Sequence, residues 1–111
     1  MNKFIRKIYS NEVDLIKKIL LQNKFPIPPS LNSMIVEGMN DGQMGSLLFV
    51  HSNKKLGKSL DPYLFKDIDD IAVSATINLD TNGEIYELDI WKVNFSPLKI
   101  DIKTEKGQNN V

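Results

Sequence analysis

The sequence contains no cysteine and only one histidine, His51, among its 111 residues. Disulfide bonds, thiolate nucleophiles and cysteine-ligated metal centres are therefore excluded within the chain, and so is a site built from several of its histidines. The runs of apolar residues are short, far below the roughly 20 residues that a membrane-spanning helix needs. We accordingly expect no metal, no cofactor and no membrane association.

The composition is that of one ordinary folded domain. Hydrophobic residues make up 41% and charged residues 25% of the chain, which is typical of soluble globular domains. The length favours one domain, so we expect a single domain over residues 1–103 and a flexible polar tail over residues 104–111. Residues 1–7 are basic and lack the apolar stretch of a signal peptide, which predicts a cytoplasmic protein.

Charges of the two signs are equal in number but unevenly placed along the chain. The 14 basic and 14 acidic residues give a net charge of zero, which provides no general attraction to nucleic acid. Residues 61–91, however, contain eight acidic residues and one lysine, a local charge of −7. This segment could attract a basic protein partner, or the basic N-terminal helix could neutralise it; the sequence leaves both readings open.

The first predicted element is a helix that starts near Glu12 and is capped by Ser10 or Asn11. Its apolar residues recur at spacings of three and four, so one side of the helix should face a core. Residues 25–29 include three prolines, which end the helix and favour an extended crossing to the sheet.

Strands are predicted where apolar residues alternate or cluster between turn residues. They cover residues 33–37, 46–50, 71–79 and 84–93, with a short further strand over 97–102. Residues 58–70 fit either a helix or a loop. The pattern predicts an α+β fold, with the N-terminal helix packed on an antiparallel sheet of four to five strands whose order stays open.

The register of the last hairpin follows from its two faces. With a two-residue turn at Asn82-Gly83, apolar residues face one another on one side and polar residues on the other. The apolar pairs are Leu79–Tyr86, Ile77–Leu88 and Ala75–Ile90, and the opposite face has Asn78–Glu87, Thr76–Asp89 and Ser74–Trp91. A three-residue loop would mix the two faces, so we predict the first register.

Acidic side chains are the main candidates for chemistry. Glu87 and Asp89 lie two apart on one strand, so their carboxylates point to the same side with Cα atoms about 7 Å apart. Paired carboxylates can act as acid and base in hydrolases, and Asp41 could join them. A chain of this size has little material for a deep cleft, which favours a solvated strand face. Residues 54–59 end like a phosphate-binding loop, but Ser52 stands where its first glycine is needed.

Trp91 continues the same strand face. A tryptophan beside charged residues is common at the centre of protein-binding sites, whereas a buried tryptophan at the sheet edge is the alternative. The residues predicted for an interaction face are Glu87, Asp89, Trp91, Lys92, Thr76, Asn78 and Asp41. No catalytic residue and no metal ligand are predicted.

Two segments resemble the signatures of a protein family. Residues 39–47 resemble a MNDGGMGSL signature, with Gln43 in place of a more usual glycine, and residues 87–98 resemble an ELDxWKxDFSPL signature, with Asn94 in place of the aspartate. Both signatures occur in small bacterial proteins of an uncharacterised domain-of-unknown-function family. These proteins are similar to the small cytoplasmic immunity proteins of toxin systems. The resemblance carries no reaction, and it implies a protein partner such as a toxin domain.

We therefore expect a non-enzymatic cytoplasmic binding protein of the immunity type, whose acidic residues within 61–91 bind a basic toxin domain. One alternative is a small carboxylate-dependent hydrolase that uses Asp41, Glu87 and Asp89. The other is a homodimer formed through Trp91 and the edge of the sheet.

Overall fold

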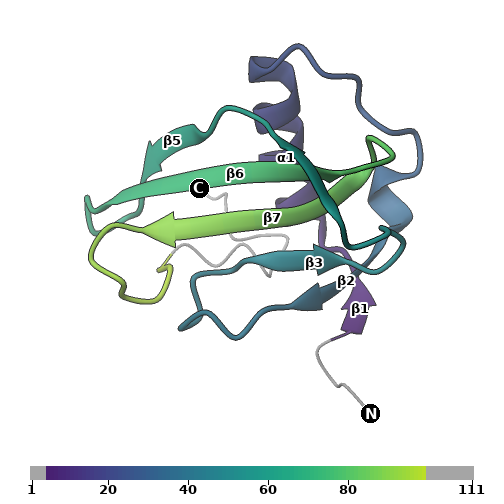
Figure 1. Ribbon diagram of the computed structural model, residues 1–111. Coiled ribbons are helices and arrows are strands. Elements are labelled where there is room, and N and C mark those ends of the chain that lie inside the picture. Colours follow the sequence, from purple (N-terminus) through teal and green to yellow (C-terminus); the bar gives the residue numbers. More distant parts are fainter. Residues whose placement is uncertain (1–4, 100–111) are drawn as a thin grey trace.

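The computed structural model describes residues 5–99 and shows one helix packed against one sheet (Figure 1). The elements in chain order are β1 (Ile5–Lys7), α1 (Ser10–Gln22), the short 3-10 helix η1 (Leu31–Ser33), β2 (Ile35–Gly38), β3 (Leu47–Phe49), β4 (Leu56–Ser59), β5 (Tyr63–Lys66), β6 (Ala72–Asp80) and β7 (Ile85–Lys92). Within residues 5–99, no helix has the length and apolar character needed to span a membrane.

The sheet has seven strands in the order β1-β2-β3-β7-β6-β4, and β5 also pairs with β6. Every pair is antiparallel. The α+β class is confirmed, but the sheet is larger than the predicted four to five strands. The strand predicted over residues 97–102 does not form in residues 97–99. Residues 100–102 and the tail predicted over 104–111 lie outside the described residues.

The three strands that the sequence did not predict are β1, β4 and β5. Strand β1 has only three residues, and all four residues of β4 are exposed, so neither carries the apolar alternation that marks a half-buried strand. Strand β5 lies inside the segment 58–70. This segment is neither a helix nor a simple loop, because β4 and β5 pair with successive stretches of the same strand, β6.

Helix α1 covers one face of the sheet and lies behind strands β6 and β7 in Figure 1. Its buried side chains contact the apolar residues that alternate along the long strands. The core cluster includes Val13, Ile16, Ile19 and Leu20 of the helix with Phe49, Ala75, Ile77, Leu88 and Ile90 of the sheet. No helix among residues 5–99 lies over the opposite face of the sheet.

The helix begins at Ser10, two residues earlier than predicted, and its N-cap is Tyr9 rather than Ser10 or Asn11. The acceptor for the first turn comes from Glu12, whose Oε1 accepts the Tyr9 backbone N–H at 2.9 Å. Arg6 donates to both oxygens of this buried carboxylate, at 2.9 and 2.8 Å. The guanidinium carbon also lies 3.9 Å from the centre of the Tyr9 ring. An ion pair with β1 therefore fixes the helix start, and no hydroxyl cap is needed.

The helix ends in a Schellman motif, in which a residue with positive φ closes the last turn. Lys24 has φ of 55°, and its N–H and that of Phe25 bond to the carbonyls of Leu21 and Leu20. Asn23 then bonds to both backbone groups of Asp61. These bonds hold the helix end against the segment between β4 and β5.

The register of the β6–β7 hairpin is confirmed from Ser74–Trp91 through Asn78–Glu87. The predicted turn is wrong, since Leu79 pairs with Ile85 and not with Tyr86. The Asp80 N–H bonds to the Glu84 carbonyl at 2.8 Å, which closes a loop of three residues, 81–83. Gly83 at φ 80° fits a type I turn followed by a left-handed residue. Tyr86 is then the extra residue of a β-bulge, which returns the strand to the register that keeps its faces separate.

Candidate functional site

The face of the sheet that α1 does not cover, hereafter the open face, carries five of the seven predicted interaction residues. Strand pairing arranges them in adjacent rows that run across the strands. The first row has Asn78 and Glu87, the second Thr76 and Asp89, and the third Leu64, Ser74 and Trp91. The polar face predicted for the hairpin therefore forms one side of the sheet and borders an exposed leucine from β5.

The first row is tied together by hydrogen bonds between side chains. Ser59 Oγ donates to Asn78 Oδ1 at 2.6 Å, and Asn78 Nδ2 donates to Glu87 Oε1 at 2.7 Å. Asn78 is buried at the base of this chain of bonds. The row thus fixes one oxygen of Glu87 and leaves the other oxygen available for a further donor.

The second and third rows are more accessible. Asp89 is exposed, and its side chain makes no hydrogen bond or ion pair within residues 5–99. Trp91 is 46% exposed and Leu64 70% exposed, so the reading of a buried tryptophan does not hold. The Trp91 ring packs against that of Phe95, with ring centres 5.9 Å apart. Short side chains, Ser74 and Thr76, stand opposite Trp91 and Asp89.

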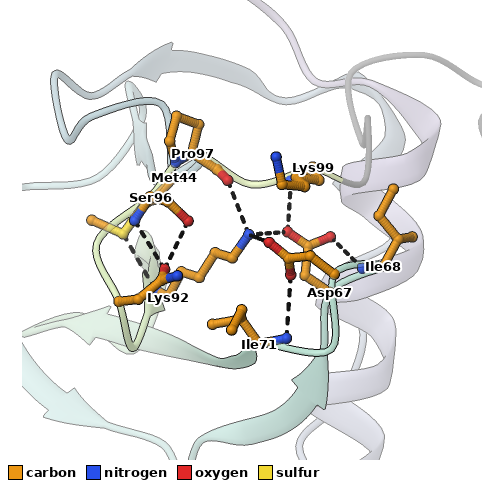
Figure 2. A network of polar contacts seen from close by, with 10 residues as sticks. Met44, Asp67, Ile68, Ile71, Lys92, Ser96, Pro97 and Lys99 are labelled. Carbon is orange, nitrogen blue, oxygen red and sulfur yellow. Dashed lines mark hydrogen bonds and ion pairs between the residues drawn. The ribbon is translucent and has the colours of Figure 1, made fainter.

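Lys92 does not belong to the open face. It follows Leu88 and Ile90 on the core side of β7 and its side chain is fully buried. Its ammonium group lies 2.8 Å from Asp67 Oδ2 and 2.7 Å from Asp69 Oδ2, and it donates to the Pro97 carbonyl at 3.2 Å (Figure 2). The buried charge is therefore paired and has three acceptors, as an ammonium group in a protein interior requires.

The two aspartates connect this lysine to the surrounding backbone. Asp67 Oδ1 accepts the Ile68 N–H and Asp67 Oδ2 the Lys99 N–H, while Asp69 Oδ1 accepts the Ile71 N–H. One cluster thus joins the β5–β6 turn, the end of β7 and the segment after it (Figure 2). Its contacts explain why lysine stands at this position without any need for a ligand.

The cluster also shifts the pKa values of its members. The hydrogen bond from Lys92 is the main cause that holds the pKa of Asp69 below its ordinary value. Burial alone would lower the pKa of Lys92, but its hydrogen bonds to Asp67 and Asp69 outweigh that effect and raise it. Asp69 and Lys92 therefore stay charged near neutral pH.

Asp41 lies in the loop between β2 and β3, and its carboxylate organises that loop. Its two oxygens accept the N–H groups of Met44 and Ser46 at 3.1 and 3.0 Å. No hydrogen bond or ion pair joins it to Glu87 or Asp89 within the described residues. Both oxygens of Asp41 are thus used by the loop backbone, and no group of three or more His, Cys, Asp or Glu side chains among the described residues could hold a metal ion.

The two signature segments meet in space, at what we call the motif junction (residues 39–47 with 87–98). Ser46 is buried, and its hydroxyl accepts the Ile90 N–H at 2.8 Å and donates to the Ile90 carbonyl at 3.3 Å. Leu98 N–H bonds to the Gln43 carbonyl at 3.2 Å, and the Lys92 N–H contacts Met44 Sδ at 3.2 Å. Strands β3 and β7 also pair here. Several signature residues therefore hold two distant segments together.

The acidic segment 61–91 does not form one acidic surface. Three of its members are neutralised internally: the buried Asp67 and the partly buried Asp69 contact Lys92, and the buried Asp80 accepts three backbone N–H groups at distances of 2.8 to 3.0 Å. Burial would raise the pKa of Asp80, but these N–H groups, from Asn53, Glu84 and Asn82, outweigh burial and lower it. Neutralisation therefore comes from one buried lysine and from turn amides.

Sequence reasoning missed the partnership of Lys92 with Asp67 and Asp69. The sequence did indicate it, because side chains alternate along a strand. Lys92 is two residues beyond Ile90 and four beyond Leu88, so it should lie on the apolar side of β7. A charged residue at such a position needs a buried partner.

Comparison with known protein families shows which family the chain belongs to. Residues 5–103 match DUF6984, a domain of unknown function. The chain belongs to the DUF6984 family. Neither the curated proteins nor the solved structures give a significant match. The DUF6984 match covers both signature segments, so the motif junction lies within the region that defines the family.

Proposed function

We propose that this DUF6984 domain is a non-enzymatic, cytoplasmic protein-binding domain of the immunity type, and that it neutralises a basic toxin domain through the open face. The observation that carries the proposal is the third row, where Trp91 and Leu64 expose apolar surface beside the carboxylate of Asp89, which has no partner among residues 5–99. Exposed aromatic and apolar side chains bordered by charge are typical of binding surfaces.

The motif junction supports the proposal by contrast. Its inward-facing polar residues, Ser46 and Lys92, are buried and bonded to other residues of the domain. The open face instead presents Asp89 without a partner in the described chain and a tryptophan with almost half its surface exposed. A partner that covers this face would bury apolar area and pair the carboxylate, both of which favour binding.

The charge available to such a partner is smaller than the sequence implies. Asp67, Asp69 and Asp80 of segment 61–91 are bound by Lys92 or by backbone N–H groups. On the open face the acidic contribution comes from Glu87 and Asp89. We expect these two carboxylates to steer association and Trp91 to supply most of the affinity.

Gene neighbourhood and co-expression test the proposal. The protein encoded by the adjacent reading frame is produced with and without this domain, and cell growth is measured. We expect the domain to restore growth and to form a complex with that protein after purification. An adjacent product that neither harms growth nor binds the domain would contradict the immunity function.

Variants of the open face connect the rescue to this surface. Trp91→Ala should abolish the complex, and Asp89→Lys should slow association and flatten its salt dependence. The matched controls lie on α1, where Leu21 is 67% exposed and Asp14 is exposed as well. Leu21→Ala and Asp14→Lys should leave rescue intact. Equal effects of the face and helix variants would contradict the assignment to the open face.

A further inference from the structure

We propose that the open face binds an arginine side chain of its partner, with the guanidinium group stacked on Trp91 and hydrogen-bonded to Asp89 and Glu87. The source of this arginine rests on the proposed function, because a protein partner must supply it. The recognition chemistry itself rests on three adjacent residues of one strand face.

The carboxylates provide the acceptors. Glu87 and Asp89 are two residues apart on β7 and point to the same side, with Cα atoms about 7 Å apart. Asn78 occupies Glu87 Oε1 at 2.7 Å and holds the side chain in place, so Oε2 is free to accept. Asp89 has no partner within residues 5–99. Several acceptor oxygens therefore stand unused on one exposed surface, and they match a donor group with several N–H bonds.

The aromatic rings provide the stacking surface. Trp91 is two residues beyond Asp89 on the same face, and its ring is tilted by 57° against that of Phe95. Both rings are exposed, at 46% and 68%. A cation above the face of an exposed tryptophan is attracted by the ring quadrupole, and the planar guanidinium group stacks there as well.

The neighbours of these groups leave room for a long side chain. Ser74 and Thr76, both short, lie opposite Trp91 and Asp89, and Leu64 stands beyond Ser74 in the same row. The aliphatic part of an arginine can therefore lie across Ser74 between Leu64 and Trp91. Lys66, two residues beyond Leu64 on β5, is paired with Asp70 at 3.4 Å.

Arginine fits this arrangement better than lysine does. A guanidinium group forms a planar fork that can donate to two carboxylates while its face lies on an indole. An ammonium group is a strongly hydrated point charge that cannot satisfy both requirements in one plane. The open face should therefore distinguish the two cations although both carry one positive charge.

Two short peptides test this inference without the natural partner. Acetylated and amidated Gly-Arg-Gly and Gly-Lys-Gly are titrated into the ¹⁵N-labelled domain, and the Trp91 indole and the amides of residues 87–91 are followed by NMR. We expect the arginine peptide to shift these resonances and to bind several-fold more tightly than the lysine peptide. Asp89→Asn and Trp91→Leu should each remove this preference, and Asp14→Asn on α1 should retain it.

The outcomes separate this inference from the proposed function. Equal binding of both peptides, or shifts that avoid the Trp91 indole, would overturn the arginine site. The growth rescue and its dependence on the open face would be unaffected by that result. Conversely, an arginine preference without any effect of Trp91→Ala on a partner complex would support the site and contradict the function. The ¹⁵N spectrum of each variant shows whether it has folded.

Discussion

Strand β7 contributes alternate residues to two regions with opposite properties. Leu88, Ile90 and Lys92 point to the core side, where Lys92 is fully buried and paired, whereas Glu87, Asp89 and Trp91 point to the open face. On the core side every charge has partners inside the domain, so that side contributes to folding. On the open face the groups remain accessible. One signature of twelve residues therefore serves folding with one set of positions and offers a binding surface with the other.

The largest effect is expected from breaking the buried ion pair between Asp67 and Lys92. Asp67→Ala leaves the Lys92 ammonium group with one carboxylate and should lower the free energy of unfolding by about 3–5 kcal/mol. Lys66→Ala removes the exposed ion pair with Asp70 and should change the free energy of unfolding by less than about 1 kcal/mol. Urea denaturation measures both. If Asp67→Ala does not fold, Asp67→Asn, which keeps an oxygen acceptor, should give a smaller loss. Equal losses at positions 67 and 66 would contradict the comparison.

Removal of the Ser46 hydroxyl should come next. Ser46→Ala leaves the buried Ile90 N–H without its acceptor, which should lower the free energy of unfolding by about 1–3 kcal/mol. Ser33→Ala is the matched control, because its hydroxyl bonds to Ser30 at an exposed site. The hypothesis of a structural signature serine fails if the two variants unfold at the same urea concentration.

The pH dependence of stability tests the charges of the same cluster. The pKa of Asp69 is lowered from 3.8, so its stabilisation is present above pH 3.8 and is lost as the pH falls through the folded-state pKa. The pKa of Lys92 is raised from 10.5, so its stabilisation is present below pH 10.5 and is lost as the pH rises through the folded-state pKa. We expect a stability plateau between these limits in chemical denaturation. Asp69→Asn should make the acid limb shallower, and an unchanged limb would contradict this assignment.

A substitution at Gln43 is expected to raise the free energy of unfolding, by less than the losses above. Its φ is 66°, a left-handed conformation that strains a residue with a side chain. Gln43→Gly should therefore raise the free energy of unfolding by up to about 1 kcal/mol, after the greater flexibility of glycine in the unfolded chain is counted. Thermal denaturation measures the change. A destabilised variant would show that contacts of the glutamine side chain outweigh the strain.

The smallest effect on stability is expected on the open face. Asp89→Asn removes a charge that has no partner within residues 5–99, so the free energy of unfolding should change by no more than about 0.5 kcal/mol. The affinity of this variant for a partner should nevertheless fall, and surface plasmon resonance would measure that affinity. A clear loss of stability would place Asp89 with the residues that serve folding.

Strong local patterns were predictable from the sequence. The alternation along residues 74–78 and 87–91 fixed the register of the long hairpin, because a slip by one residue would have exchanged its core and solvent faces. The helix periodicity identified the buried side of α1. The short strands were not predictable: β1 and β4 are three and four residues long and exposed for most of their length, so they form only because a neighbouring strand offers its backbone groups.

For the candidate site, the sequence identified Glu87, Asp89 and Trp91 as neighbours on one strand face, since a period of two requires it. It placed Lys92 with them, although the same period assigns that residue to the other side. The convergence of residues 39–47 with 87–98 could not be read from either segment, because it depends on the pairing of β3 with β7.

Periodicity in the sequence thus determined the α+β class, the helix, the long hairpin and the shared face of its polar residues. These features follow from interactions between residues close in the chain. The tertiary structure alone decided the number and order of the strands, and it decided which acidic residues stay accessible. The reason is physical: a carboxylate is neutralised by whichever donors the fold brings within hydrogen-bond distance, and for Asp67 one of these donors is Lys92, 25 positions away along the chain.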